Sequence, residues 1–272
     1  MTDDTPLVSS ATVRPLTDSD LWDDYWRELP ALPTEVGDDA SPAVAAIRDV
    51  LDRFAYSPAP ISVLDIGGAP GRWVAHLHRR FGHEVCVLDS SPVGIAMTRK
   101  NFELLGIPGE TLQRELFDLD ISSPQFDLVY SLGLIEHFED TSAAVAAHLS
   151  YVRPGGRLIL GCPNLTGLSG ALMRRLSPGV FDWHYAPVTD LRRWPSFERE
   201  FGLRVRFSGY VGGFQPGTFW RRERDRLLDR VVRRALMEAD KRWNGRAARA
   251  LSHVNSRHWS YYGIAVYDKP CA

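Results

Sequence analysis

The stretch Asp65-Ile66-Gly67-Gly68-Ala69-Pro70-Gly71 follows an apolar run over residues 61–66 and precedes an amphipathic segment over residues 72–80. The apolar run predicts a buried strand, and the amphipathic segment predicts a helix. Glycines in a strand-to-helix turn let the backbone approach a ligand at the carboxyl end of the strand. The stretch therefore predicts a ligand site at the edge of a sheet.

Strands and helices are predicted to alternate on both sides of this loop. The expected strands are 61–66, 84–88, 112–115, 126–131, 157–162, 203–210 and 259–267, and the expected helices are 19–30, 41–54, 72–80, 92–105, 141–152, 190–201 and 218–252. Such alternation predicts an α/β fold that is doubly wound, with a mostly parallel seven-stranded sheet and helices on both faces. The last strand alternates in polarity, which predicts that it is antiparallel and lies near an edge.

The overall composition excludes several classes of protein. Hydrophobic residues make up 44% of the 272 residues and charged residues 24%, as in ordinary globular proteins. The formal net charge of −2 creates no global attraction to nucleic acid or to anionic membranes. Three widely spaced cysteines lack the spacing of a zinc site or redox pair and indicate the cytoplasm. No leader pattern and no apolar stretch long enough to span a membrane is present, so we expect neither secretion nor a membrane span.

The residues of the loop narrow the choice of ligand. A dinucleotide-binding fingerprint that starts at Gly67 requires glycine at the positions of Ala69 and Arg72. A Walker-type phosphate loop requires lysine where Arg72 follows the last glycine. The Asp65 carboxylate repels a pyrophosphate but can hold an ammonium group. The loop therefore favours a ligand that carries an amine.

Further ligand-binding side chains follow the next two strands. Asp89 ends the second strand, where a carboxylate can accept both hydroxyls of a ribose. Phe117 and Asp118 follow the third strand and suit an adenine face and its amine. Together with the stretches FDLVYSLGLIEHF (126–138) and VRPGGRL (152–158), these motifs resemble the class I S-adenosylmethionine-dependent methyltransferases. The chain departs from the family motif where Ala69 replaces the middle glycine.

The resemblance covers residues 60–165 and implies S-adenosylmethionine as methyl donor, with S-adenosylhomocysteine as product. It implies the following cofactor-binding residues: Asp65, Gly67, Gly68, Gly71, Asp89, Ser90, Phe117, Asp118, Ser131, Leu132 and Tyr25. We expect a mobile tail over residues 1–18, followed by a single Rossmann-like methyltransferase domain over 19–272. Within that domain, the aromatic helix at 19–30 is expected to form a lid, and the inserted segments 165–190 and 212–255 are expected to cover the substrate.

Candidate catalytic residues follow the fourth strand. His137 is the first candidate for a base that removes a proton from an acceptor hydroxyl, with Glu136 beside it and His184 as a second candidate. The alternative is that these side chains only support the loop or line an aromatic cluster. Small-RNA and quinone-pathway relatives add a glutamate three residues earlier to hold magnesium, but this chain has Gly133 there. We therefore expect no metal.

An arginine-rich helix is predicted over residues 218–252, with eleven basic and five acidic residues. A nucleic-acid-binding role would place these arginines on phosphates: Arg221, Arg222, Arg226, Arg230, Arg233 and Arg234. The interleaved acidic residues are instead typical of a solvated helix with internal ion pairs, which argues against nucleic acid as a partner. One apolar side of the helix can cover the acceptor cleft or form a homodimer.

Three functions remain open on this basis. The leading hypothesis is methyl transfer to a small-molecule acceptor, most often a hydroxyl in this family, on a specialised metabolite or a quinone-like ring. One alternative is RNA methylation that uses the arginine-rich helix. The other is a regulatory or scaffold protein that binds S-adenosylmethionine without catalysis.

Overall fold

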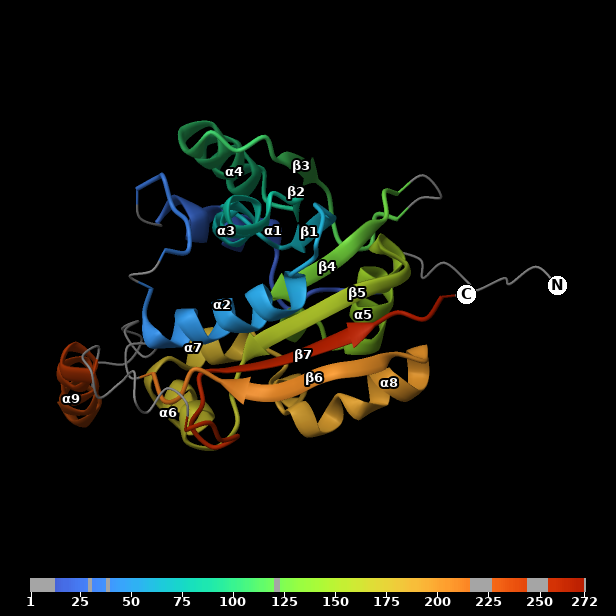
Figure 1. Cartoon of the computed structure of the whole chain (residues 1–272). Helices are drawn as coiled ribbons and strands as arrows, with labels where there is room; N and C mark the ends of the chain where they lie inside the picture. The colour runs from blue at the N-terminus through green and yellow to red at the C-terminus, as the bar shows by residue number, and fades with distance from the viewer. Residues whose placement is uncertain are drawn as a thin grey trace.

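The computed structural model describes residues 13–28, 31–37, 40–119, 123–215, 227–243 and 254–271. It contains a seven-stranded sheet in the order β3-β2-β1-β4-β5-β7-β6 (Figure 1). The strands are β1 (Ser62–Ile66), β2 (Glu84–Asp89), β3 (Glu110–Gln113), β4 (Phe126–Leu132), β5 (Val152–Pro163), β6 (Arg204–Val211) and β7 (Tyr262–Asp268). The first five strands pair in parallel, and β7 runs antiparallel to both of its neighbours. The predicted fold class is confirmed.

Helices cover both faces of the sheet (Figure 1). The α-helices of the described residues are α1 (Ser19–Arg27), α2 (Pro42–Ala55), α3 (Arg72–Phe81), α4 (Pro92–Leu105), α5 (Thr141–Tyr151), α6 (Gly167–Leu176), α7 (Pro178–Asp182), α8 (Pro195–Phe201) and α9 (Leu227–Trp243). Three short 3₁₀ turns, η1 (Ile135–His137), η2 (Ala186–Thr189) and η3 (Leu191–Arg193), follow β4 or precede α8.

Two hydrophobic clusters, one on each face, hold the helices to the sheet. Neighbouring strand residues point to opposite faces, so Leu64 joins a cluster with Val145 of α5 and Phe197 of α8. Val63 joins the other cluster, which includes Leu51 of α2 and also residues of α3. A strand that is buried on both faces needs apolar residues at every position, which explains the unbroken apolar runs in the sequence.

The last strand is antiparallel and lies one strand from the edge of the sheet, in agreement with the expectation. β7 lies between β5 and β6, and β6 forms the edge. Ile264, Ala265 and Val266 are fully buried, because β7 has a strand on each side and a helical layer on each face. A short alternating pattern does not show whether another strand will pair on its outer side.

Some element boundaries differ from the predicted ones. The third strand lies two residues earlier than expected, at Glu110–Gln113. The helix expected over 190–201 is divided into η3 and α8, because Asp190 accepts the Arg192 N–H and Pro195 starts a new helix. Of the helix expected over 218–252, the described part is Leu227–Trp243, and the flanks lie outside the described residues.

The described part of the expected N-terminal tail contacts the rest of the protein. Pro15 forms a β-bridge with Phe138, and the Leu16 N–H donates to the His137 carbonyl at 2.7 Å. Thr17 is buried. Residues 13–18 therefore run across the carboxyl edge of the sheet and lead directly into α1.

Candidate active site

One large cavity, with a volume of about 860 Å³, opens at the carboxyl ends of β1, β2 and β4. This volume lies within the range of about 300–1,000 Å³ that is typical of small-molecule sites. The loop after β1 forms one part of its wall, and η1, α1 and the segments after β3 and α7 form other parts. The cavity thus opens at the edge of the sheet at which the glycine loop predicts a ligand site.

The glycine loop is tight because its conformation leaves no room for side chains. Gly67 and Gly71 have φ angles of +69° and +82°, which L-residues with a Cβ rarely adopt. A Cβ on Gly68 would lie 2.3 Å from Cγ of Asp65. Ala69 needs no positive φ, since the described residues other than glycine have none. The departure from the family motif at Ala69 is therefore compatible with the turn.

Asp65 is a buried carboxylate that faces the cavity. The residue is 2% exposed, and its Oδ2 atom has no hydrogen-bond partner among the described residues. Burial raises the pKa of Asp65 well above its usual value. A cationic group in the cavity would supply the missing partner and favour the ionised form. Asp65 therefore fits an ammonium ligand.

Asp89 is held at the end of β2 by two backbone donors. Its oxygens accept the Ser91 N–H at 2.9 Å and the Ala69 N–H at 3.3 Å. Burial raises the pKa of Asp89 to about 6. Ser90, Phe117 and Asp118 line the same part of the cavity, together with Leu132 from β4. These residues fit the ribose and adenine of an adenosyl cofactor.

Two residues of the predicted cofactor set do not line the cavity. The Ser131 side chain is fully buried, and its hydroxyl donates to Nε2 of His148 at 2.9 Å. His148 in turn donates from Nδ1 to the Ala144 carbonyl, so Ser131 ties β4 to α5. Gly71 directly precedes α3 in the left-handed conformation, where it allows the chain to turn from the loop into the helix.

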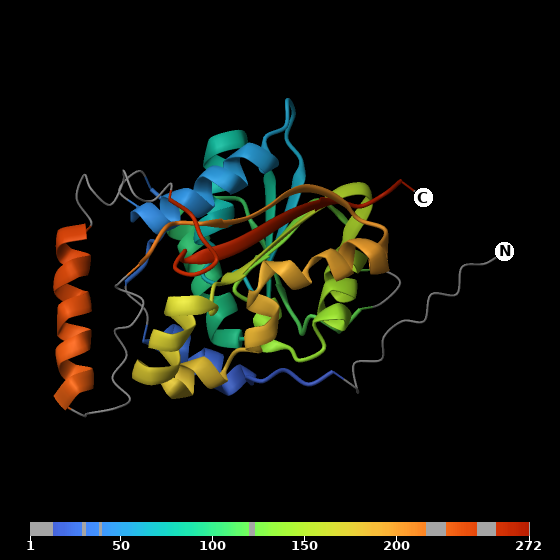
Figure 2. The same ribbon diagram turned by 90° about the horizontal axis from the view of Figure 1, so that it is seen from below.

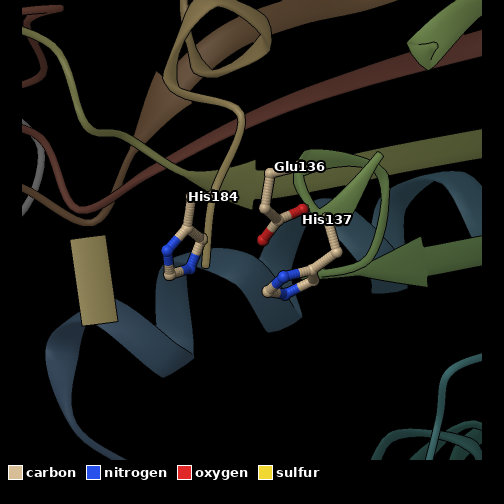
Figure 3. A group of neighbouring side chains, drawn as sticks. All are labelled: Glu136, His137 and His184. Carbon is tan, nitrogen blue, oxygen red and sulfur yellow. The ribbon is translucent and has the colours of Figure 1, made fainter. Parts of the chain in front are cut away.

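A second group of polar side chains lies elsewhere in the cavity. Glu136 and His137 belong to η1, and His184 follows α7 in the chain (Figure 3). The two imidazole centroids are 5.0 Å apart, and one ligand atom of each of the three residues lies within 4.8 Å of the others. The Tyr185 N–H donates to the Glu136 carbonyl at 2.5 Å and holds the inserted segment against η1.

Main-chain carbonyls define the tautomer of both histidines. Nδ1 of His137 lies 2.8 Å from the Trp183 carbonyl, and Nδ1 of His184 lies 2.7 Å from the Val180 carbonyl. Because a carbonyl only accepts, both Nδ1 atoms carry the proton and both Nε2 atoms carry a lone pair. Burial lowers the pKa of His137 to about 3, and it also lowers the pKa of His184. Both rings are therefore neutral bases at pH 7.

The Glu136 carboxyl differs from these two neutral imidazoles because it can donate a proton. It is 1% exposed, and its Oε2 atom has no hydrogen-bond partner among the described residues. Burial raises the pKa of Glu136 to about 8, so the carboxyl is mainly protonated at pH 7. The cluster thus combines one carboxylic acid with two imidazole lone pairs.

The same three side chains also have the composition of a metal-binding group. The expectation of no metal rested on Glu136 and His137 alone, and the structure adds His184 as a third potential ligand. Two imidazoles and one carboxyl suit transition metals such as zinc better than magnesium, which prefers oxygen ligands. The two possible roles of the cluster, in proton transfer or in metal binding, call for different experiments.

Helix α1 and the segment before it cover the cavity. Trp22, Tyr25 and Trp26 line the cavity, and no residue of α1 is fully buried in the protein core. On the outer side, Asp23 accepts hydrogen bonds from the Ser91 hydroxyl and the Val93 N–H at the start of α4. The aromatic face of α1 therefore borders the cavity.

Several residues of the site were not identified from the sequence. Trp183 and Val180 act through their carbonyls, which no side-chain pattern reveals. Asp23 had no distinguishing pattern among the other acidic residues of its helix. Arg72 did carry a recognisable feature, since it directly follows the last glycine of the loop and lines the cavity.

Helix α9 lies away from the sheet and next to α6 (Figure 2). Arg233 is buried and donates to the Leu176 carbonyl at 2.7 Å, and buried Asp229 pairs with Arg175 at 2.9 Å. Arg233 is therefore not available to a phosphate, and Arg221, Arg222 and Arg226 lie outside the described residues. None of the helices in the described ranges is long and apolar enough to cross a membrane.

The sequence is similar to known methyltransferases, which agrees with a cavity that fits an adenosyl cofactor. Residues 41–210 match the family described as "Methyltransferase domain". The ubiquinone biosynthesis O-methyltransferase of Alkalilimnicola ehrlichii is 30% identical over 142 residues, which cover 48% of this chain and 57% of the relative. An O-methyltransferase of Pyrenophora dematioidea is 28% identical over 149 residues, covering 52% and 54%. The chain thus spans little more than half the length of these curated relatives.

Solved structures show the same fold at low sequence identity. The [4+2]-cyclase SpnF superposes with a TM-score of 0.62 at 15% identity, covering 93% of this chain and 96% of the cyclase. Coclaurine N-methyltransferase bound to N-methylheliamine and S-adenosylhomocysteine superposes with a TM-score of 0.57 at 11% identity, covering 95% and 84%. These two proteins differ in chemistry, so the shared fold does not define the acceptor.

Proposed function

Because the chain belongs to the class I S-adenosylmethionine-dependent methyltransferases, we propose that it transfers a methyl group from this cofactor to a hydroxyl of a small organic acceptor. The supporting observation is that a single cavity is lined both by Asp65 and Asp89 and by the Glu136–His137–His184 cluster. One group of residues suits the cofactor, and the other suits a proton-bearing acceptor.

In this proposal, each part of the cofactor is held by the residues whose chemistry fits that part. Asp65 faces the ammonium group, Asp89 accepts the ribose hydroxyls, and Phe117 and Asp118 contact the adenine. When bound, S-adenosylmethionine supplies an electrophilic methyl group on a positively charged sulfur. Trp22 and Tyr25 of the lid exclude water from that region and present aromatic faces to the positive charge.

His137 acts as the base in this proposal. The acceptor oxygen forms a bond to the methyl carbon, the bond from that carbon to sulfur breaks, and the hydroxyl proton moves to Nε2 of His137. Nε2 is available because Nδ1 is occupied by the Trp183 carbonyl. His184 and the protonated Glu136 orient the acceptor by hydrogen bonding. Holding the two reactants in line supplies most of the remaining acceleration.

An aromatic or quinone-like acceptor that bears a free hydroxyl is the substrate class that we propose. Two observations support it: the curated relatives named above are O-methyltransferases, and Trp22, Val180 and Trp183 give the cavity an apolar wall. RNA methylation has weaker support. Arg233 of α9 is buried and donates to the Leu176 carbonyl, and Asp229 of the same helix forms an ion pair with Arg175 of α6, so this side of α9 packs against the protein.

The test combines binding with turnover. The melting temperature should increase when S-adenosylhomocysteine is added. With labelled S-adenosylmethionine, the label should then be transferred to a member of a panel of phenols, hydroquinones, amines and RNA oligonucleotides. Absence of any shift would overturn the cofactor assignment. Transfer to RNA or to an amine alone would replace the acceptor class, and binding with no transfer to any of them would favour a non-catalytic role.

A further inference from the structure

We propose that Arg72 binds the α-carboxylate of the amino-acid end of the cofactor, while Asp65 faces the α-ammonium of the same group. The inference rests on the proposed function, since it concerns the same cavity. It assigns an anion-binding role to a residue that the family motif does not specify.

Arg72 lies at the first position of α3, directly after Gly71. It is half-buried and lines the cavity together with Gly68 and Pro70. Its guanidinium lies over the Trp73 ring, 5.2 Å from the centroid. Among the described residues, none forms a hydrogen bond or an ion pair with the Arg72 side chain. The described residues therefore leave its five N–H donors available to a ligand.

Arg72 and Asp65 place a guanidinium and a carboxyl on the same cavity without an ion pair between them. Burial raises the pKa of Asp65, and the positive charge of Arg72 acts in the opposite direction; the Oδ2 atom of Asp65 has no hydrogen-bond partner among the described residues. An unpaired guanidinium and a buried carboxyl without a partner cost free energy until a ligand supplies the partners. A ligand that bears an ammonium and a carboxylate on one carbon would satisfy both side chains at once and would favour the ionised form of Asp65.

The distribution of positive charge around the cavity supports Arg72 for this role. Of the arginine and lysine side chains in the described residues, only Arg72 and Arg114 line the cavity. Arg114 follows β3 and donates to the Asp118 carbonyl at 3.5 Å, among the residues assigned to the adenine. Arg72 is thus the cation next to the glycine loop and to Asp65.

The start of α3 adds to the attraction for an anion. Gly71 provides no side-chain cap, so the first N–H groups of α3 have no capping acceptor. The positive end of the helix dipole lies at the same place. A carboxylate held by Arg72 would therefore also lie near these N–H groups.

Isothermal titration with three ligands tests the assignment without measuring activity. The ligands are S-adenosylhomocysteine, its analogue without the carboxylate (S-adenosyl-3-thiopropylamine) and its analogue without the amine. Loss of a charge-assisted interaction weakens binding by roughly 10- to 100-fold. The wild-type protein should bind both analogues more weakly than S-adenosylhomocysteine by this factor.

The variant Arg72→Gln should lose about 10- to 100-fold in affinity for S-adenosylhomocysteine and should bind the analogue without the carboxylate as the wild type does. Asp65→Asn should show the reverse selectivity, with unchanged affinity only for the analogue without the amine. Arg80→Gln is the matched control, because Arg80 is exposed on the same helix and also lies over the following aromatic ring. This control should bind all three ligands normally.

The outcomes separate this inference from the proposed function. If the wild type does not bind S-adenosylhomocysteine, the proposed function fails. If it binds and Arg72→Gln weakens all three ligands equally, or none of them, the assignment of Arg72 is overturned. Arg72→Lys should recover part of the lost affinity, and circular dichroism should show that each variant is folded.

Discussion

The indole of Trp22 meets the imidazole of His137 edge to face, with ring centroids 5.0 Å apart and ring planes at 82°. Trp22 is further held by a hydrogen bond from its Nε1 to the Thr17 hydroxyl at 3.1 Å. Leu16, one residue before Thr17, donates to the His137 carbonyl. The N-terminal segment therefore contacts both the ring and the main chain of the proposed base.

Removing the Trp22 ring should impair acceptor turnover more than cofactor binding. An aromatic contact of this kind contributes about 0.5–1.5 kcal/mol, so Trp22→Ala should lower kcat/KM for the acceptor by several-fold to about tenfold. Steady-state kinetics and titration with S-adenosylhomocysteine measure the two effects. Trp22→Phe should retain most of the activity, and equal loss in both variants would contradict an aromatic packing role.

Replacing His137 should slow the chemical step while sparing the cofactor. Loss of a general base costs roughly 10²- to 10⁴-fold in rate, so His137→Ala should show this loss in single-turnover methyl transfer. Its dissociation constant for S-adenosylhomocysteine should stay within a factor of about three of the wild type. A rate equal to that of the wild type would remove His137 as the base and leave His184 to be tested in the same way.

Cofactor affinity should weaken as the pH falls. Burial raises the pKa of Asp89 to about 6, and the ionised form is the stronger acceptor for ribose hydroxyls. Affinity for S-adenosylhomocysteine should therefore decrease by up to about tenfold per pH unit below 6. Asp89→Asn should bind at least about tenfold more weakly at pH 7.5, with a flatter pH profile between pH 5 and 7. An unchanged affinity in this variant would overturn the ribose assignment.

The Glu136 carboxyl should destabilise the folded protein at alkaline pH. Burial raises its pKa from 4.5 to about 8 in the folded state. Between these two pH values the folded protein keeps a proton on Glu136 that the unfolded protein releases. Stability is then lost as the pH rises through this window, by up to about 1.4 kcal/mol per pH unit. Glu136→Gln lacks this loss, and its melting temperature relative to the wild type should increase between pH 5 and 9. A constant difference across that range would show that Glu136 does not titrate there.

Treatment with a chelator separates proton transfer from metal chemistry at the same cluster. If His137 acts through its Nε2 lone pair, transfer should persist after dialysis against EDTA, with metal content followed by mass spectrometry. Loss of activity that zinc or cobalt restores would identify Glu136, His137 and His184 as a metal centre. Restoration by magnesium alone would point to oxygen ligands outside this group.

The residues that we propose for the cofactor could be placed together from the sequence, because they lie at junctions between strands and helices. Residues 65–71, Asp89 and Asp118 each follow a strand of a parallel sheet, and such positions meet at one edge regardless of the loops between them. The order of the motifs along the chain was therefore sufficient to bring them together.

The acceptor half depends on contacts that sequence order does not determine. His184 comes 47 residues after His137, and the two rings meet because main-chain carbonyls of the inserted segment hold them. Whether Ser131 faces the cavity or α5 depends on the direction in which one strand residue points at the sheet edge. His137 is neutral because it is buried. This burial depends on how α1 packs against the ring, which the sequence alone does not determine.

The division of the cavity between the sheet edge and the inserted segments also bears on how such an enzyme can diverge. Asp65 and Asp89 belong to strands in the core, so changes near them endanger folding. Trp22 and His184 belong to segments outside the sheet, where substitutions leave the two hydrophobic clusters intact. In the proposed arrangement, evolution or a designer can therefore change the acceptor by exchanging the segment from α6 to His184, while Asp65 and Asp89 remain in place.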